Sequence, residues 1–191
     1  MTDKIIQNLK SLVDLQPAEE KAFLDILEVK KIKKNAMLNV EGEVCNRVTF
    51  INHGNVRLYY TVEGIENTVQ FFFDGSWYTD YASFLTGAPS QENLQALSAT
   101  EVVQLTRQDL LPLYDQFPVF DRIGRFMAEN AFLSLSKLNQ MLRNETPQQR
   151  YLNLMKLRPD VMARIPQRHI ASYLGVQPES LSRIRKRLLE P

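Results

Sequence analysis

The stretch that decides the fold of the C-terminal part is residues 167–188, QRHIASYLGVQPESLSRIRKRL. Its apolar residues recur at the three- and four-residue spacing of a helix face, in two blocks. The apolar positions are Ile170, Leu174, Leu181, Ile184 and Leu188. Between the blocks, Gly175 allows the positive φ of a sharp turn, and Pro178 suits the first turn of a new helix. The pattern predicts a helix-turn-helix arrangement over these 22 residues.

The second of these predicted helices has the residues needed to contact DNA. At its N-terminal end, Arg183 can donate a bidentate hydrogen-bond pair to guanine, and Glu179 can accept a hydrogen bond from cytosine. Lys186 and Arg187 lie further along and suit phosphate contacts. The candidate DNA-binding residues are Arg168, Gln177, Glu179, Ser180, Ser182, Arg183, Lys186 and Arg187. Two alternatives are an αα-hairpin that contacts protein and, for Glu179 with Arg183, a surface salt bridge.

The charge of the chain is divided unevenly, although the net charge is only +1. Residues 1–144 hold 14 Lys and Arg against 18 Asp and Glu, whereas residues 145–191 hold 9 against 4. A basic C-terminal part on an acidic body indicates a polyanionic partner for that part alone. Chance distribution of surface charge is the alternative.

Upstream of the helical part, residues 36–106 change to the period of a β-strand. Apolar and polar residues alternate through Val48–Phe50 and Val56–Tyr60, and further strands are expected at Thr68–Phe73, Asn93–Ser98 and Val102–Leu105. Turn signals such as Asn-His-Gly-Asn and Glu-Gly separate them. Short strands with regular turns predict a β-sandwich or β-barrel. Residues 4–28, before this region, have helical spacing.

Between the strands and the C-terminal part, Val119–Arg143 contains no proline and only one glycine. The spacing predicts a single helix of about 37 Å, longer than a small β domain needs as a cover. Its apolar stripe is therefore a candidate dimer seam, with packing on its own β domain as the alternative.

Composition excludes several classes of protein. The single cysteine, Cys45, cannot form an internal disulfide or supply the four thiolates of an iron–sulfur cluster. Two histidines make a histidine-rich metal site unexpected, and no metal is expected. The chain has no apolar run of membrane-spanning length and no signal-peptide core, so a cytoplasmic location and no membrane partner are expected. No Ser/His/Asp or Cys/His set stands at a recognisable spacing, and no enzyme activity is expected.

Together these elements resemble the Crp/Fnr family of transcription regulators. The matching pieces are Val48–Leu58, Phe73-Asp74-Gly75, Ile170-Ala171, Leu174-Gly175-Val176, Pro178-Glu179 and Leu181–Ile184. The resemblance covers nearly the whole chain. It implies an α+β fold: an N-terminal jelly-roll-like β-barrel of the cyclic-nucleotide-binding type, a long dimerisation helix and a C-terminal helix-turn-helix. It also implies that Glu179 and Arg183 read the inner T-G-A type core of each half-site, with Ser182 at a third base-contacting position.

The sequence departs from this family at the nucleotide cassette and at the C-terminus. The family has a Gly-Glu pair for the ribose, where this chain has Thr79-Asp80, and an Arg-Ser-Ala stretch for the phosphate, where it has Ser90-Gln91-Glu92. An anion without a cationic partner is costly to bury, so cyclic-AMP dependence is not expected. The small β-hairpin wing that usually follows the recognition helix is also not expected, because the sequence ends at Pro191.

A different small molecule could still occupy the barrel, or aromatic side chains could fill it. The candidate effector-pocket residues are Trp77, Tyr78, Asp80, Tyr81, Ser90 and Gln91. No cofactor is assigned.

The sequence therefore predicts three parts: an effector-type domain at 1–117, a dimerisation helix at 118–144 and a DNA-binding domain at 145–191. The predicted function is a dimeric transcription regulator that binds an inverted repeat in double-stranded DNA, with RNA polymerase as a further candidate partner. The alternative is a sensory or ligand-binding module whose helical tail contacts protein.

Overall fold

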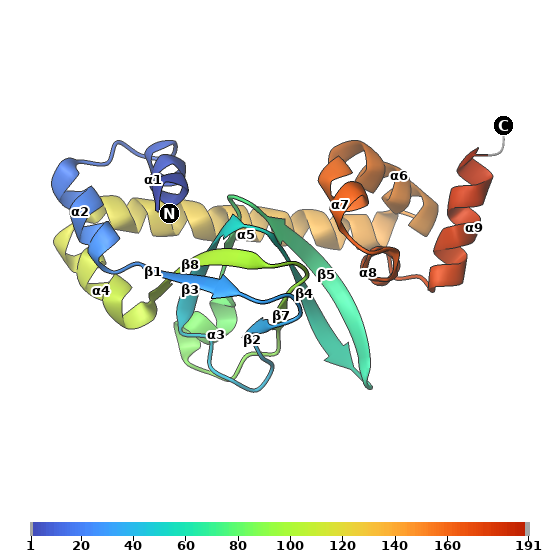
Figure 1. Ribbon diagram of the computed structural model, residues 1–191, viewed down its shortest axis with the longest axis horizontal. Helices are drawn as coiled ribbons and strands as arrows, with labels where there is room; N and C mark the ends of the chain where they lie inside the picture. Colours follow the sequence, from blue (N-terminus) through green and yellow to red (C-terminus); the bar gives the residue numbers. More distant parts are fainter. Residues whose placement is uncertain (1, 190–191) are drawn as a thin grey trace.

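The computed structural model describes residues 2–189 and shows a central β-sandwich with helices at both ends (Figure 1). Helices α1 (Asp3–Lys10) and α2 (Pro17–Asp25) lie at one end, and the C-terminal helices lie at the other. A long helix, α5 (Pro118–Asn144), runs behind the sandwich and connects the two ends. No helix in this described range is both long and apolar enough to cross a bilayer.

The sandwich consists of two antiparallel sheets of four strands each. The first sheet has the order β1 (Glu28–Ile32), β8 (Thr100–Thr106), β3 (Arg47–His53) and β6 (Trp77–Tyr78). The second has the order β2 (Met37–Asn39), β7 (Asn93–Ala96), β4 (Asn55–Val62) and β5 (Ile65–Phe73). Strand β5 is thus an outermost strand of its sheet. The arrangement confirms the predicted α+β architecture with a β-sandwich of the jelly-roll type.

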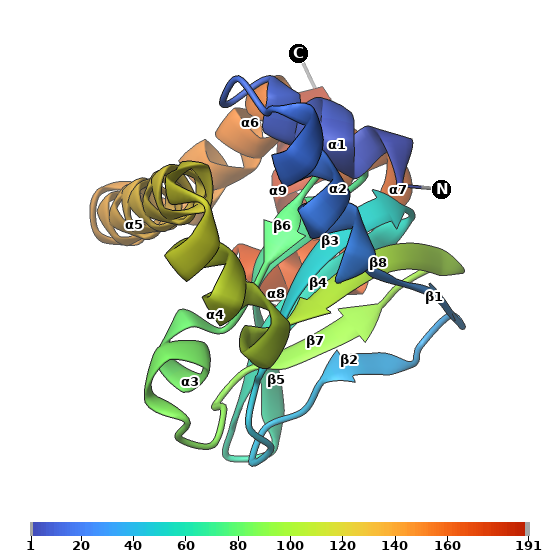
Figure 2. The same cartoon turned by 90° about the vertical axis from the view of Figure 1, so that its left-hand side faces the viewer.

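Successive residues of β3 enter two different apolar cores, because side chains alternate across a sheet. Ile51 faces the interior of the sandwich, and Phe50 faces outward onto the helices. The interior core comprises Ile51, Val56, Leu58, Tyr78, Leu94, Ala96 and Val102. The outer core joins Phe50, Val103 and Leu105 to Ile5, Leu9 and Phe23 of the N-terminal helices and to Phe120 of α5. Figure 2 shows α1 and α2 over the first sheet.

Helix α5 is buried only in its first turns. Val119, Phe120 and Ile123 are buried in the outer core, and Met127 packs against it. Helix α4 (Arg107–Gln116) approaches α5 so closely that the Tyr114 hydroxyl lies 3.0 Å from where a Cβ of Gly124 would be. Beyond Met127, α5 leaves the core and exposes large apolar side chains, among them Phe132, Leu133, Leu135 and Leu142.

Four helices form the C-terminal unit, and they share one small core. They are α6 (Pro147–Leu157), α7 (Pro159–Arg164), α8 (Gln167–Tyr173) and α9 (Pro178–Leu189). Thr146 caps α6 in a reciprocal pair of hydrogen bonds with Gln149. The buried residues include Tyr151, Leu154, Val161, Ile170, Leu174 and Leu181. Gly175, with φ of 68°, makes the turn between α8 and α9.

The C-terminal unit docks on the free edge of β5 through polar contacts that we call the β5 clasp: Arg158, Arg164 and Ser172. The Ser172 hydroxyl accepts a hydrogen bond from Thr68 N–H at 2.9 Å and donates one to the Glu66 carbonyl at 2.8 Å. Arg164 donates to the Gly54 carbonyl at 3.0 Å. Arg158 and Arg164 both lie over the Phe73 ring, with guanidinium carbons 5.4 and 4.9 Å from its centroid.

Three consecutive phenylalanines of β5 serve both sides of this strand. Phe71 and Phe73 belong to the core of the C-terminal unit, and Tyr173 packs on Phe71 with ring centroids 5.5 Å apart. Phe72 points the other way and meets Tyr78 edge-on in the sandwich. Strand β5 is therefore a wall shared by the sandwich and the C-terminal unit.

Candidate nucleic-acid interface and sandwich pocket

Helix α9 presents two faces with different chemistry. Leu181 is buried, and Ile184 and Leu188 pack beside it against the core. The opposite face is exposed and bears Glu179, Ser182, Arg183, Lys186 and Arg187. Figure 1 shows this helix at the end of the molecule, away from the sandwich. The exposed face can therefore approach a large partner.

The N-terminal end of α9 is organised by local hydrogen bonds. Arg183 donates to the Ser180 hydroxyl at 3.1 Å, and Ser182 donates to the Pro178 carbonyl at 3.1 Å. Within the part of the chain that the structure describes, the recorded hydrogen bond of Arg183 therefore goes to Ser180 and not to Glu179. The Glu179 carboxylate stands in the first turn, where the helix dipole favours a negative charge.

The remaining predicted DNA-contact residues flank this face. Gln177 is exposed in the turn before α9, and Arg168 is exposed at the start of α8. Arg168 donates to His169 Nε2 at 3.3 Å, which requires that nitrogen of His169 to be unprotonated. The structure thus brings all eight predicted residues to α9, its turn and the start of α8.

In the sandwich, Glu92 of the Ser90-Gln91-Glu92 stretch contacts two tyrosines. Glu92 accepts hydrogen bonds from the hydroxyls of Tyr60 at 2.7 Å and Tyr78 at 3.1 Å. Burial raises the pKa of Glu92, and the nearby charge of Asp80 raises it further, while the two tyrosine hydrogen bonds oppose the shift. Burial and Glu92 also raise the pKa of both tyrosines, so both keep their protons at neutral pH.

Two of the predicted pocket residues have structural partners next to this cluster. Asp80 accepts a hydrogen bond from Ser83 N–H at 3.1 Å and caps the short helix α3 (Tyr81–Thr86). The buried Ser90 hydroxyl accepts a hydrogen bond from the Asn39 amide at 2.8 Å. Asn39 also donates to the Glu92 carbonyl at 2.7 Å. Polar groups of the chain itself therefore fill this part of the sandwich.

The other three predicted pocket residues do not join the cluster. Trp77 lies on the outer face of the sheet, where its indole donates to Asn8 of α1 at 2.7 Å and packs edge-on against Phe50. Tyr81 is half-buried on α3, and Gln91 is exposed. Alternation explains why Trp77 and Tyr78 separate, because neighbouring residues of β6 face opposite sides of the sheet.

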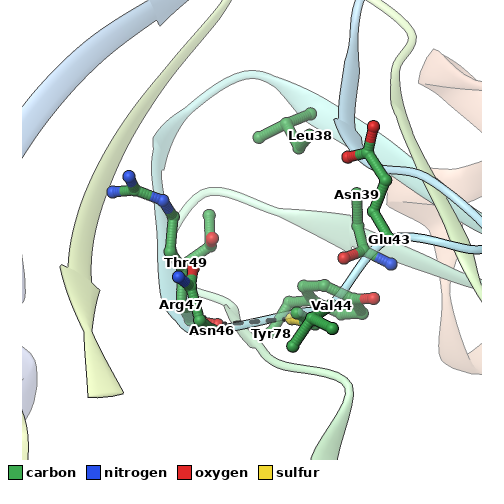
Figure 3. A pocket seen from close by; sticks show the side chains of 9 residues that line it. Leu38, Asn39, Glu43, Val44, Asn46, Arg47, Thr49 and Tyr78 are labelled. Atoms are coloured by element: carbon green, nitrogen blue, oxygen red, sulfur yellow. Dashed lines mark hydrogen bonds between the residues drawn. The ribbon is translucent and has the colours of Figure 1, made fainter. Parts of the chain in front are cut away.

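A small cavity of about 160 Å³ opens beside Tyr78, between the β2–β3 connection and the first sheet (Figure 3). It is lined by Leu38, Asn39, Glu43, Val44, Cys45, Asn46, Arg47, Thr49 and Tyr78. The Cys45 thiol donates to the Arg47 carbonyl at 3.6 Å. The volume of this cavity is below the roughly 300 Å³ at which pockets for drug-sized ligands begin.

Sequence reasoning missed the residues that most define both sites. Tyr60 looked like one more strand residue, and no motif marked Asn39. Arg150 on α6 was also missed, although it is only 9% exposed and donates to the Leu174 carbonyl in the turn before α9. A basic residue within an apolar helix pattern is the one sequence signal that could have identified Arg150.

Comparison with known proteins shows that the sandwich is similar to a known domain family. Residues 29–117, from β1 to the end of α4, match the family model of the cyclic nucleotide-binding domain. A search of curated proteins gave no match.

Several solved structures share the fold. The Catabolite Activator Protein of Thermus thermophilus aligns with a TM-score of 0.58 and 20% identity, over 96% of this chain and 87% of that chain. FixK2 from Bradyrhizobium japonicum aligns with a TM-score of 0.72 and 18% identity, over 85% of this chain and 84% of that chain. The c-di-GMP responsive global regulator CLP of Xanthomonas campestris aligns with a TM-score of 0.69 and 15% identity, over 91% of both chains. At these identities the similarity shows the fold alone.

Proposed function

We propose that this protein is a sequence-specific, DNA-binding transcription regulator of the Crp/Fnr type. In this proposal residues 1–117 form the effector-type domain, residues 118–144 the dimerisation helix and residues 145–191 a helix-turn-helix DNA-binding domain. The observation that carries the proposal is α9, which is anchored by Leu181 and exposes Glu179, Ser182 and Arg183. The similarity of the fold to a catabolite activator protein and to a global regulator supports it.

The proposal assigns base contacts to the start of α9 and phosphate contacts to its later turns. Glu179 and Arg183 are one helical turn apart and accessible, which suits a recognition helix in the major groove. Lys186 and Arg187 follow on the same exposed face and suit the backbone. Two chains related by a twofold axis would read an inverted repeat with half-sites about 34 Å apart. RNA polymerase is a further partner that such a regulator would meet.

Selection of bound sequences from a random duplex pool tests this function. The wild type is expected to select an inverted repeat. Arg183→Ala should then cost about 1–3 kcal/mol per half-site and relax the preference at one guanine. Lys186→Ala is the matched control, because loss of a phosphate contact should weaken all sequences about equally and flatten the salt dependence. If the pool yields no enriched sequence, the C-terminal helix pair is an αα-hairpin for protein contact.

The proposal includes independence from cyclic nucleotides. Glu92, bound by Tyr60 and Tyr78, puts a carboxylate where a cyclic phosphate would need a cation. Calorimetry with cyclic AMP and cyclic GMP should give no binding heat at tens of micromolar ligand. A submicromolar dissociation constant for either nucleotide would contradict this part of the proposal and leave the DNA-binding part intact.

A further inference from the structure

Arg150 on α6 connects the ends of two helices that are far apart in the sequence. Its Nη1 donates to the Glu145 carbonyl at 2.8 Å, and its Nη2 donates to the Leu174 carbonyl at 2.7 Å. Glu145 is the C-cap residue of α5, and Leu174 is the C-cap residue of α8. One guanidinium therefore joins the end of the long helix to the turn that leads into α9.

The energetics of this side chain indicate more than a packing role. Arg150 is 9% exposed, and its recorded partners within residues 2–189 are both main-chain carbonyls. Helix C-termini bear partial negative charge, which compensates the cation in part. Its Nε–H is buried and has no hydrogen-bond partner, which carries a desolvation penalty. An apolar residue of similar volume would fill the space without that penalty.

The connection matters because the direct link between α5 and the C-terminal unit is short and extended. Only Glu145 and Thr146 separate α5 from α6, and both have extended backbone conformations. Rotation about these two residues would swing the whole C-terminal unit relative to α5. The hydrogen bond from Arg150 to the Glu145 carbonyl crosses this link and opposes that rotation. The hydrogen bond to the Leu174 carbonyl lies within the C-terminal unit and holds the turn before α9 against α6.

We propose that Arg150 is a positioning residue that fixes the angle between the dimerisation helix and the recognition helix, and so sets the half-site spacing that the dimer reads. This inference rests on the proposed function. A second neighbour supports the geometry: a Cβ on Gly175 would lie 3.8 Å from Arg150 Nη2, so the guanidinium sits directly against the turn.

Selection from a pool of inverted repeats with randomised spacer length tests the proposal. The wild type should select one spacer length. Arg150→Met keeps the stem and removes both hydrogen bonds, so it should accept at least two neighbouring spacers and lose about tenfold in affinity for the preferred operator, a typical size for coupling between sites. Its affinity for an isolated half-site should stay within about twofold of wild type, because α9 itself is unchanged.

Two controls separate positioning from stability. Asn153→Ala removes the 3.0 Å hydrogen bond to the Glu145 side chain and leaves Arg150 in place, so it should keep the wild-type spacer. Arg150→Lys retains the charge but cannot span both carbonyls, so it should also broaden the spacer choice. If Arg150→Met does not fold, Arg150→Lys provides the result. A folded variant of either kind with the wild-type spacer distribution overturns the proposal.

A distance measurement keeps the inference testable if the wild type selects no inverted repeat, which would be a failure of the proposed function alone. Spin labels are placed at Ser136 on α5 and Arg187 on α9, in a Cys45→Ser background diluted with unlabelled chain. The wild type should give one narrow distance distribution, and Arg150→Met a broad one. Equal widths would overturn the positioning role of Arg150 whatever the protein binds.

Discussion

His169 is a histidine that remains neutral at neutral pH in the folded protein. It is 6% exposed on α8, where the charges of Arg57 of β4 and of Arg168 act on it. Burial, and then the charges of Arg57 and Arg168, lower its pKa from 6.5 to about 4, and Glu66 of β5 opposes the shift. The hydrogen bond from Arg168 to its Nε2 also requires the neutral form.

This residue predicts a pH dependence of stability with a definite sign. Between pH 6.5 and 4 the unfolded chain binds a proton at His169 and the folded chain does not, so the free energy of unfolding falls as the pH falls through this window. The expected loss is about 1–3 kcal/mol. Urea unfolding at several pH values measures it.

His169→Gln is the matched variant, because glutamine offers an acceptor and does not titrate. The free energies of unfolding of the two proteins should depend on pH with different slopes only between pH 6.5 and 4, and with equal slopes outside that window. The raised pKa of Glu92 acts with the opposite sign, but it acts equally in both proteins and cancels. Parallel stability curves for the wild type and the variant would show that His169 titrates normally.

Helix α5 is the element whose two halves have different environments. Its first turns pack in the outer core up to Met127, so a charge there would disturb the fold of the sandwich. Its second half leaves Leu135 57% and Leu142 48% exposed, seven residues apart and with Leu138 between them. That spacing is the seam of a coiled coil. The dimer prediction therefore belongs to the second half of the helix.

Leu135→Glu should convert the dimer to monomer, because an unpaired charge in a dry seam is costly. Sedimentation at micromolar concentration is expected to show about twice the chain mass for the wild type and a dissociation constant at least about 100-fold higher for the variant. Ser136→Glu places the same charge one position away, off the seam, and should remain dimeric. Dimers of Leu135→Glu as tight as wild type would rule out this seam.

Most of the large elements could be predicted from the sequence, because their periodicity reflects burial on one face. The long strands β3, β4, β5 and β8 and helix α5 all follow their patterns. The two-residue strand β6 and the six-residue helices α3 and α7 are too short to show a period. Pro112 lies inside α4 and does not end the helix, although proline removes a backbone hydrogen-bond donor.

The candidate sites could be predicted only where a single helix determines which residues are exposed. The exposed face of α9 follows from spacing alone, since Leu181, Ile184 and Leu188 fix the buried side. Contacts between residues distant in sequence were not predictable: Tyr60 meets Glu92 across 32 positions, and Arg150 meets Leu174 across 24. Such pairs depend on how elements pack, which no local pattern records.

The β5 clasp holds the C-terminal unit against the sandwich across the whole molecule. Arg164 bonds the Gly54 carbonyl and lies 3.6 Å from the Asp74 carboxylate. Burial raises the pKa of Asp74, but the net shift is to below its ordinary value. The lowering comes from the hydrogen bonds of the Gly54 amide and His53 and from the charges of His53 and Arg164. These contacts, with Arg158 and Ser172, span the boundary between the two units.

Arg164→Ala should loosen the clasp by about 1–2 kcal/mol, the sum of a hydrogen bond and a cation–π contact. Hydrogen exchange at the Thr68 amide, which donates to Ser172, should then speed up by about 5–30-fold. Lys156→Ala, on the exposed surface of α6, should leave that exchange rate unchanged. An unchanged rate in Arg164→Ala would mean that the two units are held together without this arginine.

The position of Ser172 on the free edge of β5 has a consequence for the synthesis of the chain. An uncovered edge strand is a template for pairing with other chains, and it promotes aggregation. The sandwich is translated before residues 145–191, so the backbone groups of Glu66 and Thr68 and the rings of Phe71 and Phe73 are bare until the last helices emerge. A polypeptide cut or halted after α5 would keep this uncovered edge permanently, and should accumulate as insoluble material rather than as a free sandwich domain.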